Sequence, residues 1–108
     1  MKINIAKKCK KKTVTRDDGE KINKVLSKNW NAEETFSIDF DNILVASVSF
    51  MDEAFGKLAL RHTKKNLQKK LRFQNILDYD RALLNDILSS RFRQKELGES
   101  GASIKPKQ

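Results

Sequence analysis

Short segments with the period of a β-strand alternate along this chain with longer segments that have the period of an α-helix. Every second residue of the segment 36–40 is apolar, which is typical of a strand with one buried face: Phe36, Ile38 and Phe40. After Thr15 the apolar residues instead recur at i, i+3, i+4 and i+8, which is one stripe of a helix: Ile22, Val25, Leu26 and Trp30. Strands that alternate with helices must mostly run parallel, because each connection crosses back over the sheet. The pattern therefore predicts a compact α/β layer.

The same reasoning gives the remaining elements. We expect short strands at 2–6, 13–15, 36–40 and 71–76, which makes about a four-stranded mixed sheet packed with about three helices. An apolar connector, 43–46, should be buried whatever its backbone state. The run of lysines that follows Ala6 should be a loop or the rim of a strand, because its charges repel one another.

Short polar residues mark where the helices begin. Thr15 or Asp17 can cap the first helix. Ser49, with Asp52 three residues later, resembles a capping box for the second helix, and Ser47 is the alternative cap. Asp78 can cap the last helix, whose expected buried face consists of Leu83, Leu84, Ile87 and Leu88.

Length and composition allow one small domain. A chain of 108 residues has room for a single modest core, which we place at 1–96, with a polar, glycine-containing segment at 97–108 as a flexible C-terminal tail. No apolar run approaches the roughly 18 residues of a membrane span. Cys9, the single cysteine, cannot form an internal disulfide. We therefore expect a cytoplasmic protein without a membrane association.

The net charge of +9 is concentrated in separate stretches. Residues 1–15 carry six lysines and no acid, and residues 61–73 carry six basic residues and no acid. The first stretch supplies candidate polyanion contacts: Lys7, Lys8, Lys10, Lys11 and Lys12. Lysines that serve only solubility are the commoner explanation, and neither interleaved aromatic residues nor a recognition-helix motif supports nucleic-acid binding. A basic nucleic-acid-binding accessory protein is therefore the alternative hypothesis.

The sequence offers no catalytic, cofactor or metal constellation. Asp52 and Glu53 are adjacent, so on a helix they point about 100° apart and suit the helix dipole better than paired acid–base chemistry. Cys9 and His62 are the only residues of their types and cannot supply a structural zinc site. No phosphate-binding or dinucleotide pattern occurs among the four glycines. We therefore expect a protein that is not an enzyme.

Two stretches of the chain have the pattern of a known family. The first is Thr15-Arg-Asp-Asp-Gly-Glu-Lys-Ile22. The second is Ile38-Asp-Phe-Asp-Asn-Ile43, followed from Ser47 by the pattern Ser-x-Ser-Phe-x-Asp-Glu-x-x-Gly-x-Leu. On these residues, the segment 13–93 resembles the STAS-like domain family of unknown function, which comprises small bacterial and phage-borne domains related to anti-sigma-factor antagonists.

The resemblance implies a small STAS-like α/β domain that acts as a regulatory protein–protein interaction module. In anti-sigma-factor antagonists, a serine in the corresponding loop is phosphorylated by an ATP-binding partner kinase of the anti-sigma type, and this switches binding off. By similarity, the candidate partner-binding or phospho-switch residues are Ser47, Ser49, Phe50, Asp52, Glu53 and Gly56. Helix capping alone would also account for a serine at this position.

Overall fold

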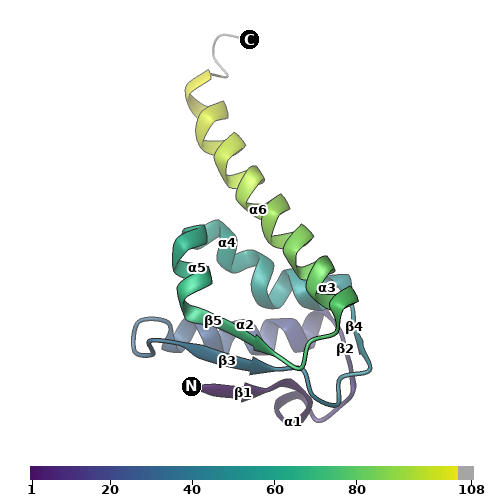
Figure 1. Ribbon diagram of the computed structural model, residues 1–108. Helices are drawn as coiled ribbons and strands as arrows, with labels where there is room; N and C mark the ends of the chain where they lie inside the picture. Colours follow the sequence, from purple (N-terminus) through teal and green to yellow (C-terminus); the bar gives the residue numbers. More distant parts are fainter. Residues whose placement is uncertain (105–108) are drawn as a thin grey trace.

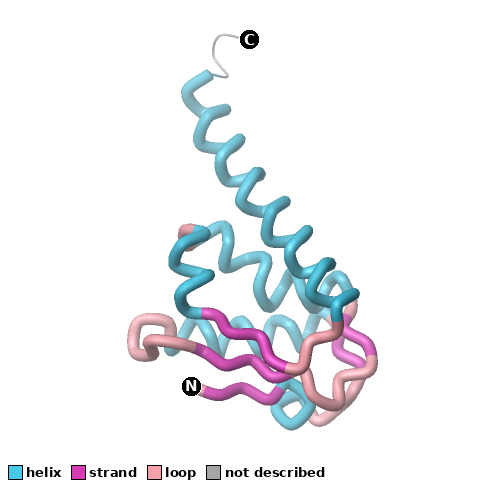
Figure 2. Tube along the Cα trace, viewed as in Figure 1, coloured by secondary structure: helices cyan, strands magenta, loops and turns pink. Residues whose placement is uncertain are grey.

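The computed structural model describes residues 1–104 of the chain, with side chains as far as residue 98. Figures 1 and 2 show short strands with helices packed against them, and one long helix that leaves the body. The elements follow in the order β1 Lys2–Asn4, α1 Ile5–Cys9, β2 Thr13–Val14, α2 Arg16–Asn29, β3 Phe36–Asp39, β4 Val45–Ala46, α3 Val48–Met51, the π-helical η1 Asp52–Gly56, α4 Lys57–Arg61, α5 Lys64–Lys70, β5 Leu71–Gln74 and α6 Asp78–Ile104.

The strands form two small parallel sheets. One has the order β1-β3-β5, with Ile3 opposite Ile38 and Ile38 opposite Phe73. The other contains only β2 and β4, in which Val14 lies opposite Ala46. The expected α/β class is confirmed, but the prediction of one mixed four-stranded sheet is wrong. The physical reason is that β2 and β4 are two residues long and pair with each other, beside the main sheet (Figure 1).

Aromatic contacts join the main sheet to the helices. Phe55 of η1 meets Phe73 of β5 edge to face, with ring centroids 5.1 Å apart. Trp30, at the end of α2, stacks on Phe36 of β3 at 5.7 Å. Buried side chains from the sheet, α2 and η1 belong to one hydrophobic core. The outward-facing positions of the same strands are polar, so each strand alternates between the core and solvent.

The core depends on a close approach between two helices. Val48–Arg61 is continuously helical, with the π-helical turn η1 in its centre, and α2 packs against it. A Cβ on Gly19 of α2 would lie 2.7 Å from the backbone oxygen of Phe50. A Cβ on Gly56 would lie 2.9 Å from the side chain of Ile87 in α6. Glycine therefore allows both neighbouring helices to reach this central helix.

Two helices differ from the sequence-based expectations. The strand that begins at Lys2 ends at Asn4, whose side chain accepts a hydrogen bond from Lys7 N at 2.9 Å and starts α1. Helix α5 was not expected, because Leu67 is its only buried residue and one apolar position makes no stripe. Thr63 caps α5 by accepting a hydrogen bond from Asn66 N at 3.1 Å.

Helix α6 continues beyond the expected domain boundary. It is helical to Ile104 and extends away from the body of the molecule (Figure 1). The predicted tail, 97–108, is thus helical in its first part, whereas 105–108 lie outside the described residues. Of the four residues expected on its buried face, Leu84 is buried, and the other three are half-buried. The domain boundary and the flexibility of the tail stay predictions.

We expect Gly19→Ala to lower the free energy of unfolding by about 2 kcal/mol, because the added methyl group meets a backbone oxygen that cannot move independently. Urea unfolding followed by circular dichroism measures this change. Gly98→Ala is the matched control, since nothing lies within 4 Å of the added atom in that helical position. Equal stability of the two variants would show that the contact between α2 and α3 is not tight.

Candidate functional site

The site begins where β4 leads into α3. Ser47 caps the helix: its Oγ accepts a hydrogen bond from Phe50 N at 3.0 Å, and its carbonyl accepts one from Met51 N at 3.1 Å. Its own N–H donates to Val14 O at 3.1 Å, which holds the cap against β2. The expected capping box of Ser49 with Asp52 is therefore wrong, and the alternative cap is the one used. The helix starts two residues earlier because Ser47 is already fixed by its hydrogen bond to Val14 O of β2.

Ser49 lies in the first turn of this helix and is half-buried. Because Ser47 satisfies the cap, the Ser49 hydroxyl is not needed to start the helix. In the described part of the chain it makes no hydrogen bond to another protein group.

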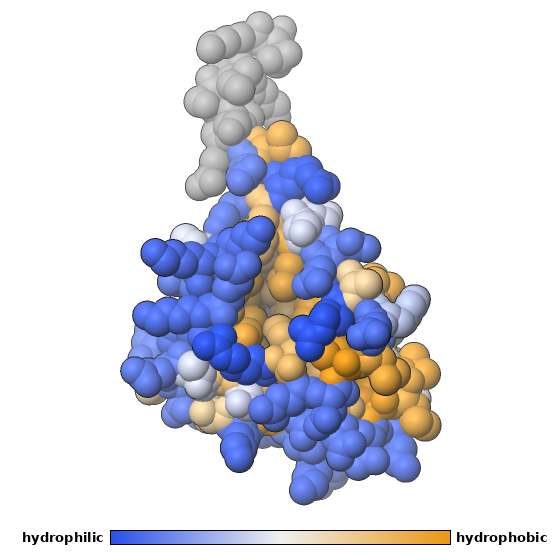
Figure 3. Space-filling model, in the orientation of Figure 1, coloured by the Kyte–Doolittle hydropathy of each residue, from blue (hydrophilic) through white to orange (hydrophobic). Residues whose placement is uncertain are grey.

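Three large apolar side chains are exposed beside the two serines. Leu44 is 70% exposed, Val45 53% and Val48 59%. Together with Ser47 and Ser49 they form what we call the β4–α3 patch. Figure 3 shows an orange surface over the region where Figure 1 places β4 and the start of α3.

This exposure corrects the expectation that the whole segment 43–46 is buried. Ile43 and Ala46 are buried, but Leu44 and Val45 are not. Leu44 N donates to Lys12 O at 2.8 Å, which ties the backbone to the β2 side and leaves the side chain outside. Strand β4 has two residues and pairs only with β2. One of its faces packs on the core through Ala46, and the other face, with Val45, stays exposed.

The remaining candidate residues of this segment are engaged inside the molecule. Phe50, Glu53 and Gly56 are buried. Glu53 pairs with Lys57 and, at 3.5 Å, with Arg16 of α2. These side chains hold the helix in place and support the patch from beneath.

Asp52 connects the helix to α6. Its carboxylate accepts two hydrogen bonds from Arg91, one of them from Nε to Oδ1 at 2.7 Å. The hydrogen bonds from Arg91 hold the pKa of Asp52 below its ordinary value of 3.8, and burial opposes this only in part. The partner-binding role of these residues stays a prediction.

Four of the five candidate lysines are brought together. Lys7, Lys10, Lys11 and Lys12 line one cavity of about 360 Å³ with the side chains of Asn4 and Asn42. Lys11 also pairs with the buried Asp18 at 3.2 Å. Lys8 lines a separate hollow beside Val25 instead. Lys7 borders both hollows, whereas Lys10, Lys11 and Lys12 border only the first.

Cys9 and His62 have structural surroundings. Cys9 is buried in the core, and this burial raises the pKa of its thiol. His62 stacks on Trp30 with ring centroids 4.3 Å apart, and burial together with the nearby Arg61 lowers its pKa. Among the residues that the structure describes, no three side chains of His, Cys, Asp or Glu are grouped so that they could hold a metal ion. Nor does any helix of residues 1–104 contain an apolar stretch long enough to span a bilayer.

Comparison with known proteins identifies the family. The family model of the STAS-like domain of unknown function (DUF4325) matches residues 18–81, which include most of α2, the main-sheet strands β3 and β5, and the β4–α3 patch. The chain therefore belongs to this family, and the resemblance inferred from the sequence is confirmed. No curated protein and no solved structure matches the chain.

We expect the Asp52–Arg91 pair to stabilise the fold by about 1–2 kcal/mol at neutral pH. The pKa of Asp52 is lowered in the folded state, so this contribution is present above its ordinary pKa of 3.8 and is lost as the pH falls through the lowered value. The difference in unfolding free energy between the wild type and Asp52→Asn should therefore shrink in acid. Urea unfolding across this range measures it. Arg93→Met, at an exposed position of the same helix, is the control; a difference that is independent of pH would contradict the assignment.

Proposed function

We propose that this protein is a regulatory protein–protein interaction module that binds its partner through the β4–α3 patch. The observation that carries the proposal is the exposure of Leu44, Val45 and Val48 beside the Ser49 hydroxyl. Large apolar side chains that gather on a surface and have polar neighbours are typical of a site of protein contact. We propose binding rather than catalysis, since the patch is apolar apart from two serine hydroxyls, one of which caps the helix.

The position of the patch also suits regulation by phosphate. Ser49 lies in the first turn of the continuous helix Val48–Arg61, where backbone N–H groups and the helix dipole favour an anion. The acids that would repel a phosphate are both neutralised: Asp52 by Arg91, and Glu53 by Lys57. These ion pairs offset most of the repulsion that the two carboxylates would exert on a phosphoserine.

The resemblance to anti-sigma-factor antagonists supports a proposal for the class of partner. Because the chain belongs to a STAS-like family, we propose an ATP-binding, kinase-like protein as the partner. Such a protein would dock on the apolar side chains and present its nucleotide to the Ser49 hydroxyl. A phosphate there would then place charge within the apolar contact and weaken the complex.

We expect the tagged full-length chain to retrieve an ATP-binding, kinase-like protein from its native host. Val48→Asp should reduce the retrieved amount at least about tenfold, because a charge is placed inside an apolar contact. Leu97→Asp is the matched control, since Leu97 is 64% exposed on the distal part of α6. Equal retrieval by both variants would exclude the β4–α3 patch as the docking surface.

The same assay separates the roles of the two serines. Ser49→Asp, which mimics the phosphate, should weaken the complex, whereas Ser49→Ala should bind but accept no phosphate from the retrieved protein and ATP. Ser47→Ala should still accept phosphate, with the fold less stable by about 1 kcal/mol because the cap is lost. Phosphate on Ser47, or undiminished binding of Ser49→Asp, would contradict the switch.

A basic nucleic-acid-binding accessory protein is the second candidate, and the lysine cavity favours it. We expect that, if this function holds, a gel shift with single-stranded DNA is lost at moderate salt and on Lys7→Ala, Lys10→Ala and Lys12→Ala substituted together. Lys28→Ala, on the exposed side of α2, is the control. Absence of binding at low salt would eliminate this candidate.

A further inference from the structure

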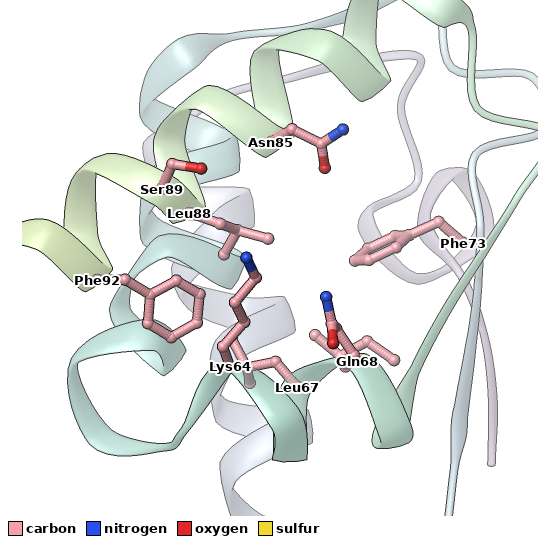
Figure 4. Close-up of a pocket in the computed structure, with 9 residues that line it drawn as sticks. Lys64, Leu67, Gln68, Phe73, Asn85, Leu88, Ser89 and Phe92 are labelled. Carbon is pink, nitrogen blue, oxygen red and sulfur yellow. The ribbon is translucent and has the colours of Figure 1, made fainter.

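A second apolar surface lies between α5, β5 and α6, on different residues from the β4–α3 patch. It is a groove of about 400 Å³, which we call the α5–α6 groove. Its apolar lining comprises Leu67, Leu71, Phe73, Leu88 and Phe92. Figure 3 shows a hollow beneath α6 with orange at its floor and blue on both sides. Figure 4 shows the rings of Phe73 and Phe92 on opposite sides of the cavity, with Leu88 and Lys64 between them.

The groove has a shape that can accommodate a helix. One wall is α6, where the lining positions 85, 88, 89 and 92 follow the spacing i, i+3, i+4 and i+7. The other wall is α5, where Lys64 and Gln68 are one turn apart, and the floor is β5. Phe73, Leu88 and Phe92 remain half-buried, so the chain's own side chains do not fill the space between the two walls. An amphipathic helix binds such a groove through apolar residues at the same spacing.

The positive charge around the groove indicates which kind of helix would bind there. Of the four lysines of α5, Lys64 lies in the lining and Lys65 is exposed next to it, whereas the other two line a separate hollow. On α6, Lys95 Nζ lies 5.8 Å from the centre of the Phe92 ring. A second copy of a chain with net charge +9 would bring lysines against lysines. A helix with carboxylates beside its apolar face would instead pair with them.

The lining also favours a peptide over a nucleic acid. Three of its five apolar residues are leucines, which fill space but offer no stacking surface for bases. Only one cation, Lys64, lies in the lining, whereas a nucleic-acid strand needs several along its phosphates. We propose that the α5–α6 groove binds an acidic amphipathic helix of a partner protein, with the helix's apolar residues on Phe73, Leu88 and Phe92 and its carboxylates at Lys64 and the adjacent Lys65.

Two designed peptides test this proposal on the full-length chain. Both are helical, about 18 residues or five turns long, and share one apolar face. One carries glutamates on its polar face and the other carries lysines. We expect the glutamate peptide to bind at least about tenfold more tightly in fluorescence anisotropy, with an affinity that falls as salt rises. Amide chemical shifts in NMR should change at Leu67, Phe73, Leu88 and Phe92.

Variants locate the binding and its charge preference. Leu88→Asp should abolish it, while circular dichroism reports whether the variant folds. Lys64→Glu with Lys65→Glu changes only exposed residues and should reverse the preference between the peptides. Lys24→Glu with Lys28→Glu, at two exposed positions of α2, is the charge-matched control and should leave both affinities unchanged.

Several results would overturn the proposal. They are equal affinity for the two peptides, no binding of either, or shift changes outside the groove. Tighter binding of a fluorescent oligothymidine that Leu88→Asp removes would assign the groove to nucleic acid instead. A dimer in sedimentation that Leu88→Asp dissociates would assign it to a second copy of the chain.

Discussion

The close packing of α2 against the helix Val48–Arg61 is the contact on which the remaining structure depends. It requires Gly19, because any larger residue would meet the backbone oxygen of Phe50. The helix held in this way carries Phe55 into the aromatic contacts with the sheet and places Gly56 against Ile87 of α6. One helix thus contacts both α2 and α6 while it covers the inner face of the strands.

The same helix sets the geometry of the proposed site. Its first residue follows Ser47, which is fixed between the helix and β2 by hydrogen bonds to Phe50 N and Val14 O. The β2–β4 pair is too small to cover Leu44 and Val45, so they stay on the surface next to the helix start. The ion pairs of Asp52 and Glu53 hold the helix from the other side and leave its first turn without free acidic charge. As a consequence, the helix start is held by hydrogen bonds, has an apolar surface and carries no unpaired acid that would repel a phosphate.

Two separate surfaces follow from incomplete coverage of the core. The β4–α3 patch is exposed because β4 is short, and the α5–α6 groove is open because α6 leaves the body as it ascends (Figure 1). The first combines apolar side chains with a hydroxyl, which suits regulated docking. The second combines an apolar floor with lysines, which suits an acidic helix.

The sequence by itself determined the α/β class, the family, the strand 36–39 and the positions of the main helices, because alternation, apolar stripes and caps are local properties of neighbouring residues. It missed α5, whose one buried residue makes no stripe, and it assigned the cap to Ser49 because either serine satisfies the local pattern. Only the tertiary structure decided that Val45 is exposed, that Asp52 pairs with Arg91 and that four lysines share a cavity without Lys8. These outcomes depend on which distant segments become neighbours. Arg91 is 39 residues from Asp52 along the chain, and no local period records such a contact.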